Sequence, residues 1–94
     1  GFAAFSWAKF GFRSLAQSMA REFGPIGIHV AHVIIDGAID IEWIEELFPE
    51  TYAKKKDDGI LNPEDIAEVY WQLHLQKRSA WTQEMDLRPW METF

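Results

Sequence analysis

The chain has 94 residues, which is enough for one small domain with a modest core. Its 15 acidic residues outnumber 9 basic ones, and the charge of −6 argues against nucleic acids and anionic membranes as partners. Because the sequence holds no cysteine, it excludes disulfides, thiolate zinc sites and a cysteine nucleophile, and we expect a cytoplasmic location. Aromatic residues make up 15% of the chain, which predicts a dense core or an apolar surface that meets a partner.

Residues 3–24 are predicted to form a helix, because apolar residues recur there at steps of three and four. Gly24-Pro25 then ends the helix. The apolar stripe consists of Phe5, Ala8, Phe12, Leu15, Ala16, Met19 and Phe23. Trp7 and Phe10 lie off this stripe, so we expect the first half of the helix to be buried on two sides.

Residues 28–35 are predicted to form a strand. The segment is short, β-branched and nearly continuous in apolar character, which is typical of a strand covered on both faces in a parallel sheet. Asp36-Gly37 ends it.

Residues 39–60 begin with a predicted short amphipathic helix and continue as a charged connection over residues 54–59. The apolar face of this helix consists of Ile41, Ile44, Leu47 and Phe48. Glu42, Glu45 and Glu46 lie between these positions, and we interpret them as a solvated face rather than a catalytic cluster, because no nucleophile or base accompanies them.

Residues 63–76 are predicted to form the next helix, which Asn62 caps and Pro63 opens. Its buried stripe consists of Ile66, Val69, Tyr70 and Leu73. Apolar and polar residues then alternate over residues 81–88, which indicates a half-exposed or edge strand.

The order of helix, strand, short helix, helix and strand contains one βαβ unit, which predicts an α/β fold with a parallel strand pair. Two parallel strands are too few for an independent sheet, so we expect one partial domain over residues 1–94. Something must cover the open edge of its first strand.

The run from Ala3 to Gly11 resembles the active-site helix of the short-chain dehydrogenase/reductase family, which carries Tyr-x-x-x-Lys there. The later segments follow in the family's order, and the tail from Asp86 to Pro89 is similar to that of one subgroup. The resemblance covers the whole chain but only about the C-terminal third of a family member. It implies the C-terminal part of a doubly wound Rossmann-type domain, with residues 39–60 as the lid over the substrate.

The resemblance places Phe5 at the position of the catalytic tyrosine and Lys9 at that of the family lysine. In the family the phenol is the general acid/base of hydride transfer, and the lysine lowers its pKa and binds the nicotinamide ribose. Because phenylalanine has no proton to donate, Phe5 is not competent in this role. Lys9 is still expected to hold a ribose, although an ordinary solvated lysine is an equal interpretation.

The resemblance further implies that the turn over residues 36–40 meets the nicotinamide. Gly37 and Ile39 match the family pattern Pro-Gly-x-Ile/Val-x-Thr, and the backbone of Ile39 is expected to contact the nicotinamide amide. Asp36 stands where the family has proline, and Ile41 stands where it has the threonine that contacts the diphosphate. A simple strand-to-helix turn is the alternative.

The family's Gly-rich phosphate loop, acidic ribose ligand and catalytic serine segment have no counterpart in these 94 residues. The intact protein is therefore expected to use NAD or NADP, and this chain alone is expected to bind no cofactor.

Other candidate sites are weaker. His29 and His32 point to opposite faces of a strand and His74 is distant in sequence, so no metal site is expected. Ser6 and Ser18 have no activating partner at helical spacing. The tryptophans Trp71, Trp81 and Trp90 are expected in subunit contacts, and Trp43, Phe48 and Tyr52 in the core or an interface of the lid segment.

Two hypotheses follow. The first is the C-terminal segment of a short-chain dehydrogenase/reductase, an NAD(P)-dependent oxidoreductase whose catalysis is impaired by Phe5. The second is a non-enzymatic oligomerisation module or a pseudoenzyme remnant. Both predict partners for the apolar helix: a second copy in a dimer or tetramer, or the N-terminal half of the domain.

Overall fold

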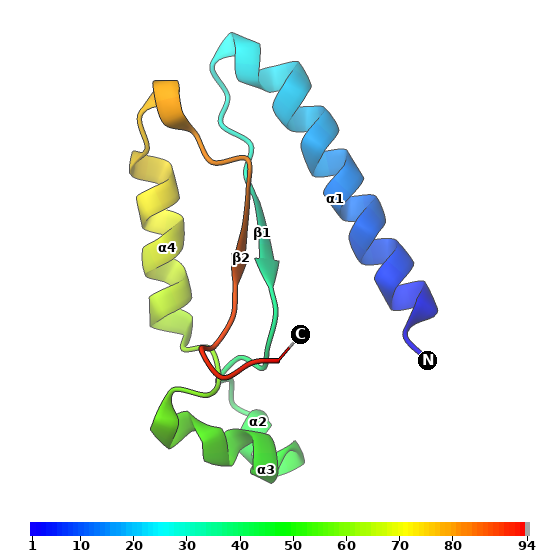
Figure 1. The fold of residues 1–94 in the computed structure, drawn as a ribbon, viewed down its shortest axis with the longest axis vertical. Coiled ribbons are helices and arrows are strands. Elements are labelled where there is room, and N and C mark those ends of the chain that lie inside the picture. The colour runs from blue at the N-terminus through cyan, green and yellow to red at the C-terminus, as the bar shows by residue number, and fades with distance from the viewer. Residues whose placement is uncertain (94) are drawn as a thin grey trace. The chain divides into compact units, whose positions relative to one another are not determined.

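The computed structural model describes residues 1–93 and shows the predicted order of elements (Figure 1). Its helices are α1 (Ala3–Phe23), α2 (Ile44–Leu47), α3 (Pro49–Tyr52) and α4 (Pro63–Leu75), and its strands are β1 (His32–Ile35) and β2 (Glu84–Leu87). Short 3-10 helices cover Gly24–Ile26, Ala53–Asp57 and Arg78–Ala80.

Strands β1 and β2 pair in parallel, with α4 in the connection between them (Figure 1). The His32 amide donates to Gln83 O at 2.8 Å, and the Asp36 amide donates to Leu87 O at 2.9 Å. Both partners advance by four residues, which is the register of a parallel ladder. The predicted α/β fold with a parallel βαβ unit is confirmed.

The chain folds into two compact units, and each unit takes one half of each strand. Unit 1 contains Gly1–Val33 and Gln76–Met85. Unit 2 contains Ile34–Leu75 and the residues from Asp86 onward.

In unit 1, the chain leaves α1 through a second, tighter turn of helix. Gly24 keeps a right-handed helical conformation, and Gly27 at φ 93° is the left-handed residue that ends the 3-10 helix. The Ile28 amide still donates to Phe23 O at 3.1 Å. The prediction that the strand begins at residue 28 is therefore wrong, because this part of the chain is bound to the helix end and β1 begins only at His32.

The second strand is likewise shorter than the predicted 81–88, since β2 spans Glu84–Leu87. Just before β2, the chain is bound by the side chain of Gln76 instead of by a neighbouring strand. The Thr82 amide donates to Gln76 Oε1 and the Gln76 Nε2 group donates to Thr82 Oγ1, both at 2.7 Å.

In unit 2, α4 begins as predicted, because Asn62 Oδ1 accepts a hydrogen bond from the Glu64 amide at 2.9 Å. Leu73 is buried and Ile66 and Val69 are half-buried. Tyr70 is 50% exposed, so its assignment to the buried stripe is wrong.

The apolar sides of α1 are open to solvent. Trp7 is 81% exposed, Phe12 63% and Phe5 62%, whereas Ala16 is the buried residue of this helix. The expectation that the helix is buried on two sides is therefore wrong for this chain. Few apolar side chains of the described residues are buried, namely Ala16, Ile44, Ile60, Leu73 and Pro89.

Among residues 1–93, no helix combines the length and the hydropathy that crossing a bilayer requires.

Candidate functional site

Helix α1 brings Phe5 and Lys9 together at one end of unit 1. Their spacing of four residues places both on one face of the helix, one turn apart. The Lys9 Nζ atom lies 5.3 Å from the centre of the Phe5 ring, within the range of a cation–π contact. The ring thus occupies the place of a proton donor beside the lysine, but it offers the ammonium only its π face.

The turn over residues 36–40 follows β1 in unit 2 and contains Gly37 and Ile39. Gly37 has φ 143°, a conformation that side chains with a Cβ atom rarely adopt. Ile39 forms an isolated parallel bridge with Leu61, in which Ala38 O accepts from the Leu61 amide at 2.7 Å and the Asp40 amide donates to Leu61 O at 2.8 Å.

This bridge determines where the backbone groups of Ile39 point. Its hydrogen bonds use the groups of Ala38 and Asp40, the residues on either side. In an extended chain, the N–H and C=O of one residue point opposite to those of its neighbours. The amide and carbonyl of Ile39 therefore point away from Leu61, and they offer one donor and one acceptor side by side.

The lid segment, residues 39–60, contains more helix than predicted. The 3-10 helix Ala53–Asp57 covers part of the stretch that the sequence predicts as a charged connection. Its end is fixed by hydrogen bonds from the Asp58 amide to Lys55 O and from the Gly59 amide to Lys54 O, at 3.0 and 2.8 Å.

Lys55 ties the lid segment to the turn. Its Nζ atom lies 2.9 Å from Asp40 Oδ2 and 5.3 Å from the centre of the Tyr52 ring. The hydrogen bond with Asp40, and then the charge of that carboxylate, raise the pKa of Lys55.

The glutamates of this segment are exposed, as predicted for a solvated face. Trp43 and Phe48 pack at a ring distance of 6.2 Å and are 48% and 51% exposed, so neither forms a core.

Arg88 links the ends of the two strands in unit 2. It binds Asp86 through two hydrogen bonds, Nη2 to Oδ2 at 2.6 Å and Nε to Oδ1 at 3.2 Å. Its Nη1 atom lies 3.2 Å from Asp36 Oδ2. The hydrogen bond with Asp86, together with the negative charges of Asp86, Asp36 and Glu92, raises the pKa of Arg88.

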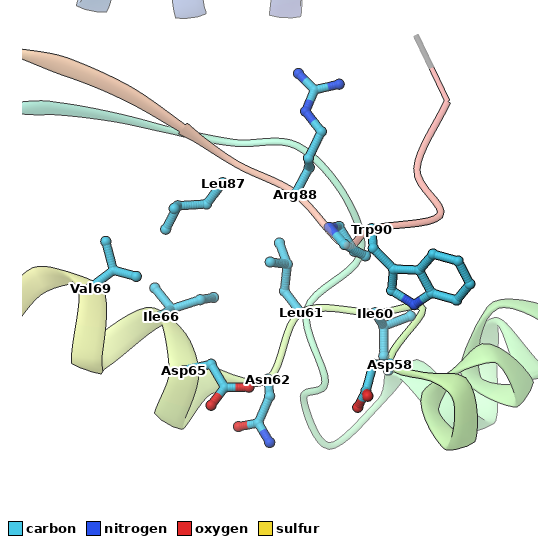
Figure 2. Close-up of a pocket in the computed structure, with 11 residues that line it drawn as sticks. Asp58, Ile60, Leu61, Asn62, Asp65, Ile66, Val69, Leu87, Arg88 and Trp90 are labelled. Carbon is cyan, nitrogen blue, oxygen red and sulfur yellow. The ribbon is translucent and has the colours of Figure 1, made fainter.

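A hollow of about 380 Å³ lies in unit 2 between α4 and the end of β2 (Figure 2). Ile66 and Val69 of α4 and Leu87 of β2 point toward one another across it, and the Arg88 guanidinium points away from α4. Trp90, at the other end, donates from Nε1 to Asp57 O at 2.8 Å. The lining of the hollow is thus partly apolar and partly polar, with charged groups from Asp58, Asp65 and Arg88.

The histidines of unit 1 have separate partners. His29 Nε2 lies 2.7 Å from Thr82 O, and its ring stacks on Trp81 with centres 4.6 Å apart. His32 Nδ1 lies 3.2 Å from Glu84 Oε1. Within residues 1–93, no group of three or more histidines, cysteines or acids is placed to hold a metal ion.

Glu84 joins α1 to β2 inside unit 1, and sequence reasoning missed this contact. Arg13 binds it through both oxygens, Nε to Oε1 at 2.6 Å and Nη2 to Oε2 at 2.7 Å. The two residues are 71 positions apart, so no local pattern indicates the pair. The hydrogen bonds from Arg13 and, to a lesser extent, His32 lower the pKa of Glu84 below its ordinary value of 4.5.

The Arg13–Glu84 pair should make the stability of the protein depend on pH. Because the folded pKa of Glu84 is lowered, its stabilisation is full above pH 4.5 and disappears as the pH falls through the lowered pKa. We expect Arg13→Gln to lower the urea midpoint at pH 7 and to have a smaller effect once Glu84 is protonated, when only the contact of Arg13 with the Phe10 ring remains to be lost. Arg21→Gln, on the same helix, serves as the control. An equal loss at every pH would contradict the assigned role of Glu84.

Comparisons with known proteins place this geometry in context. No protein-family model and no curated protein matches the chain. Among solved structures, the chain is similar to a short-chain dehydrogenase from Rhodopseudomonas palustris, with 46% sequence identity and a TM-score of 0.64. The match covers 96% of this chain and 31% of the dehydrogenase, so the chain spans about a third of that protein's length.

At this identity the match bears on sequence as well as on fold. It supports the resemblance to the C-terminal part of a short-chain dehydrogenase, and with it an oxidoreductase family. The chain has the α/β fold of part of a Rossmann-type domain, and over nearly its whole length it is similar to one third of a short-chain dehydrogenase.

Proposed function

We propose that this chain is the C-terminal part of a short-chain dehydrogenase/reductase-type protein that binds NAD or NADP and is impaired in carbonyl reduction. The observation that carries the proposal is the 46% identity over 96% of the chain. By the family resemblance, Lys9 of unit 1 would contact the nicotinamide ribose, and the 36–40 turn of unit 2 would contact the carboxamide.

The residues present suit one end of a dinucleotide. Ile39 offers an amide and a carbonyl that point away from Leu61, which complements the C=O and NH2 of a carboxamide. Lys9 offers an ammonium that would donate to ribose hydroxyls. The diphosphate end has no such partner in this chain, because Ile41 has no hydroxyl and a Gly-rich loop is absent from these residues.

When bound, the nicotinamide would supply or accept a hydride. The chain's own part is to hold the ribose through Lys9 and to orient the carboxamide through Ile39. The proton that must accompany a hydride in carbonyl reduction has no donor at Phe5, since a benzene ring does not ionise. We therefore expect the protein to bind the cofactor and to have little carbonyl reductase turnover.

The test uses the full-length protein that contains this chain, titrated with NADH and NADPH and then assayed on a panel of ketones and alcohols. We expect binding with little turnover. Lys9→Met should weaken binding at least tenfold, because a hydrogen bond to a charged group contributes about 1.5–3 kcal/mol. Lys77→Met, at an exposed lysine after α4, should leave it unchanged. Robust turnover, or no binding of either cofactor, would contradict the proposal.

A second candidate function is association, and the exposure of α1 favours it. A helix with Trp7 81% exposed and Phe12 63% exposed needs an apolar cover in water. We propose that the N-terminal half of the domain covers one side and a second copy the other, in a dimer or tetramer. Light scattering on the full-length protein at high concentration tests this, and a monodisperse monomer would overturn it.

A further inference from the structure

The conformation of the 36–40 turn depends on what replaces the family's proline. Proline fixes its own φ, whereas aspartate leaves this angle free. Asp36 gains two other constraints in exchange. Its amide, which proline lacks, donates to Leu87 O at 2.9 Å, and its carboxylate lies 3.2 Å from Arg88 Nη1.

Arg88 is itself held in place, so it can act as a fixed support. Its fork binds both oxygens of Asp86, and its side chain is 21% exposed. Such a two-point contact fixes the plane of the guanidinium as well as its position. In Figure 2 the guanidinium points away from α4.

Pro89, which follows Arg88, supports Gly37, which follows Asp36 in the turn. A Cβ atom on Gly37 would lie 2.7 Å from Pro89 Cδ, so the Gly37 backbone rests directly on the proline ring. The end of β2 thus holds the start of the turn: Leu87 and Arg88 contact Asp36, and Pro89 contacts Gly37. On the other flank, the bridge to Leu61 holds Ala38 and Asp40. Ile39 lies between these two supports.

We infer that Arg88 is a positioning residue, which acts through Asp36 to hold the Ile39 amide and carbonyl in place for the carboxamide of a nicotinamide cofactor. The inference rests on the proposed function and deepens it. Arg88 faces Asp36, Asp86 and Glu92. Its removal would leave these carboxylates to repel one another across the strand ends, which would loosen the turn on that side.

The experiment compares two ligands of the full-length protein, NADH and ADP-ribose. ADP-ribose keeps the adenosine, the diphosphate and a second ribose but has no nicotinamide. We expect Arg88→Gln to weaken NADH at least tenfold and to change ADP-ribose by less than twofold. Arg88→Lys should fall between, because lysine keeps the charge and loses the fork. Arg78→Gln, at an exposed arginine, is the matched control.

A reciprocal variant tests the path through Asp36. Asp36→Asn should weaken NADH as Arg88→Gln does, and the double variant should be no weaker than the single ones, since both remove the same interaction. Equal losses for NADH and ADP-ribose would show a general structural role, and no loss for either would show none. Each of these outcomes overturns the inference. If the wild type binds neither ligand, the proposed function fails and the inference falls with it.

Discussion

Replacing Phe5 with tyrosine is expected to raise the carbonyl reductase turnover of the full-length protein by about 10²- to 10⁴-fold, the usual contribution of a positioned general acid. The helix already places position 5 one turn before Lys9, and the ammonium lies 5.3 Å from the ring centre. A phenol at this position would donate the missing proton, and the nearby positive charge would lower its pKa.

Phe10→Tyr is the matched control for this gain. Phe10 lies on the same helix and is 62% exposed, as Phe5 is. The Phe10→Tyr substitution adds the same hydroxyl at a position that lacks the four-residue spacing to Lys9. Steady-state rates on the ketone panel measure both variants. Equal rates for Phe5→Tyr and wild type would show that the missing phenol does not limit the reaction.

Gly37→Ala is expected to destabilise the protein by about 2–6 kcal/mol. A residue with a side chain at such a positive φ costs about 1–3 kcal/mol, and the overpacking adds about 1–3 kcal/mol. The new Cβ would lie 2.7 Å from Pro89 Cδ, in a ring that cannot rotate away. The urea midpoint of the full-length protein measures the loss.

Gly11→Ala is the opposite case on helix α1. Apart from its chain neighbours and its own helix backbone, a Cβ on Gly11 meets no described atom within 4 Å, and the residue lies within a helix. The substitution should stabilise the protein by about 0.5–1 kcal/mol, because alanine loses less backbone entropy than glycine. If both glycine variants had the same midpoint, the close packing of Gly37 on Pro89 would be refuted.

The fold was predictable where local signals are strong. The step of three and four in α1, the Asn62 cap of α4 and the β-branched run of β1 each predict an element that the structure contains. The ends of the strands were not predictable, because they depend on particular contacts of the flanking loops. Thr82 is held by the Gln76 side chain and Ile28 by Phe23, and neither contact leaves a pattern in the sequence.

The candidate site was predictable only in part, for the same reason. Phe5 and Lys9 share one helix, so spacing alone brings them together. Arg88 and Asp36, by contrast, are far apart in sequence and meet because two strands end side by side. The sequence around Arg88 indicates only a family likeness, whereas its contacts with Asp36 and Asp86 depend on the fold. The exposure of α1 was also not predictable from its apolar period. The period identifies the apolar face of the helix, but not whether another segment packs against that face.

The bridge between Ile39 and Leu61 has a consequence for how such a protein diversifies. The lid segment leaves the turn and returns to it at hydrogen-bonded neighbours, so its two ends are clamped whatever lies between them. Doubling the length of a closed loop costs only about 0.6 kcal/mol of closure entropy. Insertions, deletions or replacement of the intervening residues therefore change the free energy of folding little through loop closure. If the proposed function holds, substrate preference would change through this segment while the strand pair stays constant.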